Sequence, residues 1–195
     1  MAAPLSKTIA DLSGKWIMNK TQSTPVDAGL AIQGVSWLTR KIVGAATITL
    51  DVKQYTGPPS PPAEPNGPAV AHIEIEQTGT AGLKGSTEKR CLDYTFREHS
   101  DWLFGTVRGQ SKFIALADVE DAHLAKGWLE GAEEKTGPNG EAHMLSHVES
   151  VDAGWMATQI WGFQLIEGVR KYVRRIVVAK DTQRAELVLV YDFLG

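Results

Sequence analysis

The chain has 195 residues, of which 43% are apolar and 22% charged, with a net charge of −3. This near-neutral balance provides no global basic field for binding nucleic acid or an anionic membrane. Cys91 is the only cysteine, and no apolar run reaches the roughly 18 residues of a membrane-spanning helix. We therefore expect a cytoplasmic protein without intramolecular disulfides, stable membrane insertion or a nucleic-acid partner.

The N-terminal part of the chain is predicted to hold one strand and two short helices. Residues Lys15–Lys20 favour a strand, with Trp16 and Met18 on the same face. From Asp27 to Lys41 the apolar residues recur at helical spacing. Because glycines interrupt this pattern, as at Gly34, we expect two short helices rather than one.

The remaining chain reads as a succession of strands. Residues 46–55 alternate cleanly, with Ile48, Leu50 and Val52 on one face. Two stretches interrupt the strands: a proline-rich hairpin loop at 57–68 and an acidic surface excursion at 117–141. Further strands are predicted at 70–78, 86–93, 94–98, 101–116, 142–151, 155–166, 169–179 and 185–193.

This pattern predicts an all-β domain spanning residues 1–195, with roughly eight to ten antiparallel strands and a short helix pair near the N-terminus. Closing such a sheet into a barrel removes its unpaired edges. A barrel of this size has room for one small ligand. A β-sandwich is the alternative architecture.

Short runs at a characteristic spacing open the chain: Gly14-Lys15-Trp16, then Asp27 and Leu30, then Gly34-Val35 and Thr39-Arg40-Lys41. In these runs the chain resembles the intracellular fatty-acid-binding proteins, small relatives of the lipocalins. The resemblance covers residues 1–55 and continues beyond them only as a succession of strands. It implies a lipocalin-like barrel with the helix pair as a lid, enclosing one fatty acid or similar lipid.

The resemblance also implies where a ligand would be bound. In many family members the ligand carboxylate meets an arginine on a late strand and an Arg-x-Tyr pair on the last strand. Here Arg175 falls at the first position and Tyr191 matches the tyrosine, while Leu189 stands where the second arginine would be. The other expected cavity-lining residues are Leu30, Trp37 and Trp161; tryptophans could line a cavity for a flat ligand or simply fill a core.

Few residues indicate chemistry. Arg175 could meet an anionic or carbonyl group of a ligand, or pair with an internal carboxylate. If the barrel is catalytic, Arg175, Tyr191 and His147 are the candidates for polarising a carbonyl or moving a proton, although histidines placed like His147 more often face solvent. His143 and His147 are too far apart along one strand to share a metal ion. Nothing in the sequence indicates a metal, nucleotide or flavin, so we expect no cofactor.

Two classes of function remain open. The first is a carrier that binds a small hydrophobic ligand, such as a lipid or a polycyclic metabolite, in the barrel cavity. The second is a cofactor-free isomerase or cyclase acting on a polyketide- or terpenoid-like metabolite in the same cavity. Holding reactants in an attack geometry accelerates such a reaction and requires no sequence motif. The sequence leaves open whether the protein is an enzyme, and also its oligomeric state.

Overall fold

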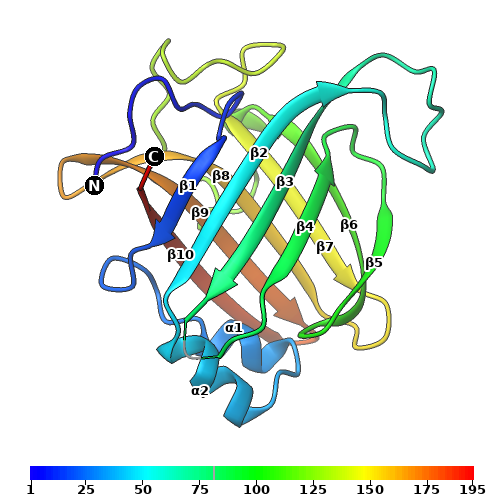
Figure 1. Ribbon diagram of the computed structural model, residues 1–195, viewed down its shortest axis with the longest axis vertical. Coiled ribbons are helices and arrows are strands. Elements are labelled where there is room, and N and C mark those ends of the chain that lie inside the picture. Colours follow the sequence, from blue (N-terminus) through cyan, green and yellow to red (C-terminus); the bar gives the residue numbers. More distant parts are fainter. Residues whose placement is uncertain (81) are drawn as a thin grey trace.

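The computed structural model describes residues 1–80 and 82–195. The described residues form one antiparallel sheet that curls into a nearly closed barrel (Figure 1). The ten strands are β1 (Gly14–Met18), β2 (Ile48–Gly57), β3 (Val70–Gly79), β4 (Ser86–Cys91), β5 (Arg97–Asp101), β6 (Gly105–Ile114), β7 (His143–Ser150), β8 (Met156–Ile166), β9 (Val169–Lys180) and β10 (Gln183–Phe193). Two helices, α1 (Asp27–Ile32) and α2 (Trp37–Ala45), and a short 3-10 turn, Leu116–Asp118, complete the fold.

The strand order around the barrel is β4-β3-β2-β1-β10-β9-β8-β7-β6-β5. The first strand therefore joins the two halves of the sheet, because β1 pairs with β2 on one side and with β10 on the other. The sheet ends at β4 and β5, which are not neighbours in the ladder. One continuous curled sheet confirms the predicted barrel and excludes the sandwich.

Trp16 on β1 belongs to a core cluster that includes Ile9 and Leu12 of the N-terminal arm, and this arm lies at the barrel end away from the helices (Figure 1). The Trp16 ring is fully buried and lies 4.8 Å from the Phe193 ring and 5.2 Å from the Tyr172 ring. The indole N–H donates to the carbonyl of Leu12 at 2.8 Å. Burial of such aromatic rings is a large stabilising contribution, and here it joins strands from the two ends of the chain.

An ion pair fastens the N-terminal arm to this end of the barrel. Arg170, at the start of β9, binds both carboxylate oxygens of Glu134 at 2.7 and 2.6 Å. The same guanidinium donates to the carbonyls of Pro4 at 2.8 Å and Lys7 at 2.9 Å. Arg170 also lies 3.7 Å from the centre of the Phe163 ring. One side chain thus joins the arm, the excursion and the sheet.

The helices cover the opposite end of the barrel (Figure 1). Helix α1 packs on β9 and β10, and Gly29 allows the close approach: a Cβ at this position would lie 2.8 Å from Leu187 Cδ1. Helix α2 begins at Ser36, whose hydroxyl accepts a hydrogen bond from the Thr39 N–H at 3.3 Å. It buries none of its residues. The lid is therefore held mainly through α1.

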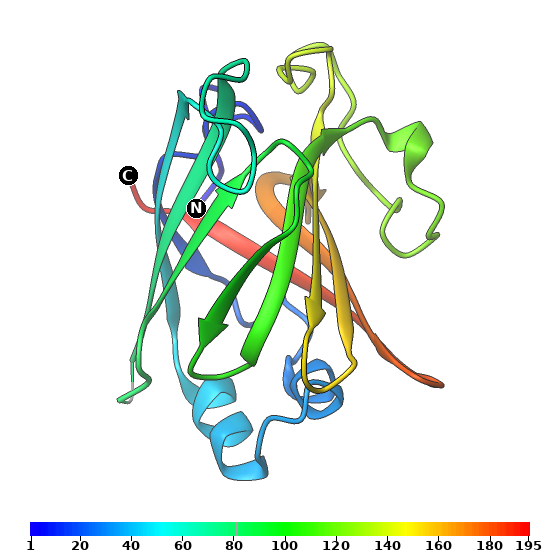
Figure 2. The ribbon, with the colours of Figure 1, turned by 90° about the vertical axis from the view of Figure 1, so that its right-hand side faces the viewer.

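Residues 115–142, between β6 and β7, lie against the outside of the barrel. Leu124 is buried there against Ile160 and Val177, which point outward from β8 and β9. His143, at the start of β7, is also fully buried, and its Nε2 lies 2.6 Å from Glu130 Oε1. This part of the sheet is therefore covered on both faces. Side chains of the barrel interior pack on its inner face, and the excursion lies against its outer face (Figure 2).

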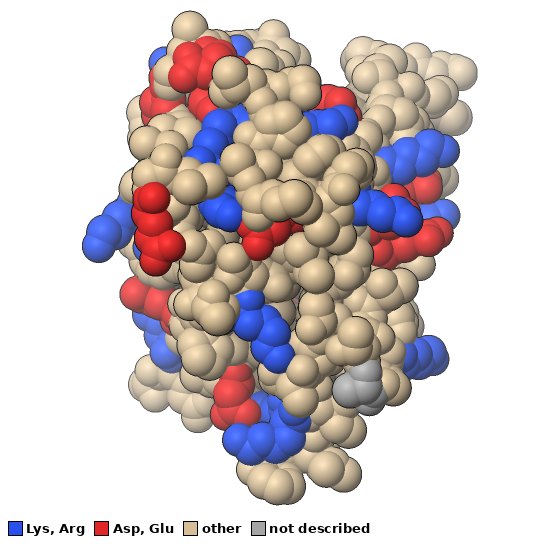
Figure 3. Space-filling model, turned by 60° about the vertical axis from the view of Figure 1, so that its left-hand side comes forward, with Lys and Arg blue, Asp and Glu red and all other residues tan. Residues whose placement is uncertain are grey.

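On the face shown in Figure 3, Lys and Arg side chains are interspersed with Asp and Glu. The described residues form no large patch of one sign on that face, in keeping with the small net charge. Among the described residues, none of the helices has the length and apolar character needed to cross a membrane.

Candidate functional site

A cavity of about 840 Å³ lies inside the barrel, with lining residues that range from the helices to the β2–β3 loop. Side chains from α1, from most of the strands and from the β5–β6 turn line it. A cavity of this volume is in the range that accommodates a metabolite-sized ligand.

The phase of β9 decides which arginine faces the cavity. Arg174, Ile176 and Val178 line the cavity, whereas Val177 packs beneath the excursion on the outer face. Side chains of a strand alternate between the two faces, so Arg175 lies outside with Val177. The inward basic residue is therefore Arg174, one position earlier than the residue expected from the sequence.

Arg174 is a buried cation at the polar end of the cavity. Only 4% of its surface is exposed, and its Nε donates to the Tyr172 hydroxyl at 2.9 Å. Its guanidinium lies 3.8 Å from the centre of the Trp161 ring. Nη2 has no hydrogen-bond partner among the described residues. Because a buried guanidinium needs acceptors, this side chain has unused capacity to bind an oxygen atom of a ligand.

A second arginine lies near the first. Arg90, on β4, donates to Ser146 Oγ at 2.6 Å and to Glu88 Oε2 at 2.8 Å. Its guanidinium lies 5.0 Å from the Trp161 ring, so this one indole contacts both cations. Burial raises the pKa of Glu88, but Arg90 and Arg174 outweigh it and hold that pKa below its usual value. Glu88 is therefore an ionised carboxylate that partly balances the two positive charges.

Two phenols complete this polar end. Burial raises the pKa of Tyr172 and of Tyr191, in both cases against the opposing effect of Arg174. Both hydroxyls consequently remain protonated at neutral pH. The Tyr172 hydroxyl is occupied as the acceptor from Arg174, whereas Tyr191 lines the cavity. The Tyr191 O–H can therefore donate a second hydrogen bond to a ligand.

The opposite end of the cavity, beneath the helices, is apolar. Leu30 of α1 lines it there, opposite a packed cluster that contains Ile176, Val178, Leu187 and Trp155. The cavity is thus divided, with a hydrocarbon wall toward the lid and a cationic, hydrogen-bonding cluster deeper inside. Such a cavity suits a largely apolar molecule that carries a carbonyl or a similar acceptor.

The structure brings together four of the residues selected from the sequence. Leu30, Leu189 and Tyr191 line the cavity, and Trp161 is fully buried against Arg174. Trp37 lies elsewhere: it is 63% exposed on α2 and is not part of the cavity wall.

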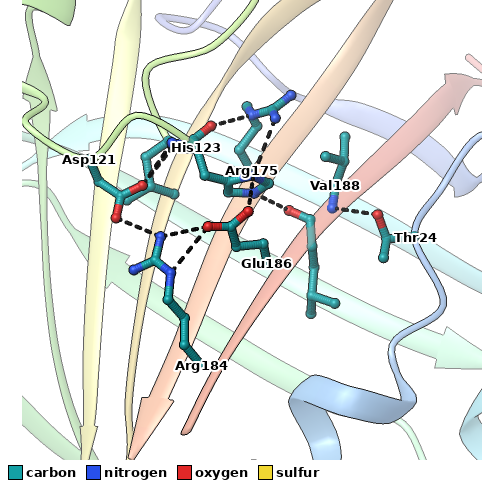
Figure 4. Close-up of polar contacts among 9 residues, drawn as sticks. Thr24, Asp121, His123, Arg175, Arg184, Glu186 and Val188 are labelled. Atoms are coloured by element: carbon teal, nitrogen blue, oxygen red, sulfur yellow. Dashed lines mark hydrogen bonds and ion pairs between the residues drawn. The ribbon is translucent and has the colours of Figure 1, made fainter. Parts of the chain in front are cut away.

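Arg175 belongs to a polar cluster on the outer face of the barrel (Figure 4). Its Nε donates to the His123 carbonyl at 2.6 Å, and its Nη2 lies 3.3 Å from His123 Nδ1. The His123 Nε2 in turn lies 3.1 Å from the Leu187 carbonyl. Arg184 joins Asp121 to Glu186 in the same cluster. Arg175 therefore fastens the excursion to β9 and β10 and does not reach the cavity.

His147 also lies on the outer face of the barrel. Its Nδ1 is 2.9 Å from Thr158 Oγ1 and its Nε2 is 3.2 Å from Glu149 Oε1. The neighbouring Val148 lines the cavity, so the alternation of β7 directs His147 away from it.

Sequence reasoning missed Arg174, Arg90 and Glu88. Apolar and polar residues do not alternate clearly over 173–178, because both faces of β9 are buried. The barrel interior covers the inner face and the excursion covers the outer one. On β4 the sequence STEKRC resembles an exposed strand. The register of β4 on β3 was the usable signal: Glu88 and Arg90 pair with Ile75 and Ile73, whose side chains are buried in the core.

No group of metal-binding side chains is found among the described residues. The site is built instead from guanidinium, phenol and indole groups around an apolar space. These groups can bind and orient a carbonyl-bearing molecule and stabilise negative charge on its oxygen.

Solved structures of the same fold are similar over nearly the whole chain. A fatty acid transporter, REP1-NXSQ, superposes with a TM-score of 0.53 and 14% identity, over 95% of this chain and 98% of its own. Fatty-acid-binding protein 1 of Echinococcus granulosus gives 0.53 and 15%, over 94% and 98%. The fluorescent protein UnaG gives 0.55 and 13%, over 94% and 97%. The expected likeness to fatty-acid-binding proteins is thereby confirmed for the fold.

No family model matches the chain. Two fungal proteins are similar along its full length. One, named "Pericyclase pydY", from an Acremonium species, is 29% identical over all of this chain and 98% of its own length. The other, named "Probable pericyclase scpY", from Mollisia scopiformis, is 31% identical over all of this chain and 95% of its own length. On that identity and coverage, the chain belongs to the family of the Mollisia scopiformis protein.

Proposed function

We propose that this protein catalyses a pericyclic ring closure or isomerisation of an apolar, carbonyl-bearing metabolite inside the barrel. The names of the two fungal relatives support the reaction class. The observation that carries the proposal is Arg174, a buried cation that lines the cavity and whose Nη2 has no hydrogen-bond partner among the described residues. Its counterpart in the sequence analysis, Arg175, has no place in the proposed site, and neither has His147.

The proposed reaction needs no atom from the protein. In an intramolecular cycloaddition two π bonds become two σ bonds, and no group enters or leaves. The protein then has two tasks: to hold an extended chain in its folded, reactive conformation, and to stabilise charge on the activating carbonyl oxygen. The apolar wall of Leu30, Ile176 and Leu187 suits the first task. Arg174, with Tyr191 as a second donor, suits the second.

A comparison of Arg174→Met with Arg175→Met tests this assignment, because the two side chains are adjacent but lie on opposite faces of β9. The substrates would be linear polyenes that carry an α,β-unsaturated carbonyl. We expect Arg174→Met to slow ring closure by about a hundredfold, the effect of losing one preorganised donor, and Arg175→Met to retain the wild-type rate. Arg174→Lys, which keeps the charge, should recover part of the loss.

Two results would contradict the proposal. One is an Arg174→Met protein that is folded and fully active. The other is a wild-type protein that converts none of the polyenes, and native mass spectrometry should accompany the assay to detect bound but unchanged molecules.

That second result would favour a carrier, which is the other candidate function. The observation in its favour is the barrel fold shared with proteins named as fatty acid transporters and fatty-acid-binding proteins. A carrier would retain a cellular lipid through purification and release it unchanged on denaturation. An enzyme would release a ring-closed product.

A further inference from the structure

We propose that the gap between β4 and β5 is a lateral slot through which a hydrophilic arm of the bound ligand stays in water while its apolar body fills the cavity. The slot is formed by residues 86–91 and 97–101, the two ends of the sheet. Every one of these residues contributes to the cavity wall. This inference rests on the proposed binding of an apolar ligand in the cavity and adds the chemical nature of a second part of that ligand.

The exposure of β5 indicates that the barrel is open here. On a strand of a closed barrel, one face is covered, as on β2, where Ile48, Leu50 and Val52 are buried. On β5, the consecutive residues 98–100 are all exposed, so that both faces of the strand reach solvent. Figure 2 faces this side of the barrel, where β4 and β5 run past each other without a backbone ladder between them.

The slot is also chemically unlike the rest of the wall. The sequences of β4 and β5, STEKRC and REHSD, contain no large apolar side chain. The wall across the cavity is hydrocarbon, formed by Ile176, Val178 and Leu187. A molecule with an apolar body and a polar arm gains most when its body lies against that wall and its arm lies in the slot. Charged edge strands also resist pairing with a further strand, which keeps the slot open.

Side-chain hydrogen bonds, rather than strand pairing, tie each side of the slot to other parts of the barrel. Arg90 of β4 donates to Ser146 of β7 at 2.6 Å inside the barrel. Arg97 of β5 reaches the carbonyls of Ser60 and Pro61 in the β2–β3 loop at 2.6 and 3.0 Å. These bonds hold β4 and β5 each to a neighbouring part of the barrel. The slot is therefore a supported opening and not a frayed edge.

A pair of fluorescent probes tests the slot. Both are amides of dansyl-undecanoic acid: one is the methyl amide, and the other carries a polyethylene glycol chain too large for the cavity. Wild-type protein should bind the two with Kd values within about threefold of each other. A double variant, Thr87→Trp with Ser100→Trp, places indoles at exposed positions on the two sides of the slot. It should weaken the polyethylene glycol probe by at least about tenfold and leave the methyl amide unchanged.

The matched control is Thr56→Trp, an exposed strand position outside the cavity wall, which should alter neither affinity. The inference is overturned if the wild type binds the methyl amide but rejects the tethered probe, or if the double variant binds both probes as the wild type does. It is also overturned if the double variant loses both probes equally while remaining folded by circular dichroism. Failure of wild type to bind either probe would instead refute the ligand-binding cavity itself, and the slot with it.

Discussion

The buried ion pair between Arg170 and Glu134 gives the sharpest stability prediction. Glu134 is 2% exposed and receives two short hydrogen bonds from one guanidinium. Replacing it by Gln keeps the shape of the side chain but removes its charge, leaving Arg170 as an uncompensated buried cation. Breaking a buried pair from one side costs about 3 to 5 kcal/mol.

The structure places the expected loss at the lower end of that range. Arg170 keeps its hydrogen bonds to the carbonyls of Pro4 and Lys7 when the carboxylate is gone. We therefore expect Glu134→Gln to lower the free energy of unfolding by about 3 kcal/mol. In a chain of this length that corresponds to a fall in Tm of roughly 6 to 12 °C. Amide hydrogen exchange should rise in residues 1–12, which the pair fastens to the barrel.

Differential scanning calorimetry and urea unfolding measure the change. The matched control is Glu133→Gln, the exposed neighbour, which should stay within about 0.5 kcal/mol of wild type. A double variant, Glu134→Leu with Arg170→Met, leaves no unpaired ion and should recover part of the loss, but not all of it, because the carbonyls of Pro4 and Lys7 lose their donor. If Glu134→Gln behaves like Glu133→Gln, the pair does not hold the arm and the reasoning is wrong.

Three further predictions concern other parts of the fold. Burial raises the pKa of Asp93, but hydrogen bonds from Arg97 and neighbouring groups prevail and lower it to about 2. The stability that the ionised carboxylate contributes should therefore be complete above the unfolded pKa of 3.8 and be lost as the pH falls toward 2. The loss should be about 1 kcal/mol after solvent screening. Asp93→Asn should abolish that part of the acid dependence in urea titrations between these pH values, and an unchanged slope would argue against it. Leu124→Ala should cost about 2 to 5 kcal/mol of local stability, seen as faster hydrogen exchange confined to 116–142; uniform exchange along the chain would contradict a separate outer cluster. Gly29→Ala should push α1 away from Leu187 at a cost of about 1 to 3 kcal/mol, raising both the association and dissociation rates of the methyl amide probe in stopped-flow fluorescence; unchanged rates would show that this contact does not close the lid.

The barrel could be predicted because its strands are largely covered on one face. Where one face of a strand is exposed to solvent, as on β2, the alternation of apolar and polar residues identifies both the strand and the face that points inward. Apolar residues at helical spacing between Asp27 and Lys41 indicated the helix pair, and the resemblance to fatty-acid-binding proteins implied its role as a lid. Both signals are local and can be read from a single sequence.

The inward arginine could not be assigned in the same way. Its strand is covered on both sides, by the cavity layer and by Leu124 and Trp128 of the excursion. With apolar residues on both faces, Arg174 and Arg175 are equivalent in the sequence, and a shift of one residue exchanges their roles. The excursion that removed the signal lies some fifty residues away in the chain. Only the three-dimensional arrangement distinguishes the two.

The position of β1 between β2 and β10 has a consequence for how the chain reaches this state. The Trp16 ring has its nearest aromatic neighbours on β9 and β10. Trp16 is synthesised early, so its ring can pack only after the last two strands have been synthesised. Contacts that span so much of the chain slow folding and leave earlier strands with open edges during synthesis. A chain shortened before β10 would leave one edge of β1 without its partner strand and would expose part of the indole. Such a fragment should associate with its own copies rather than persist as a smaller folded protein.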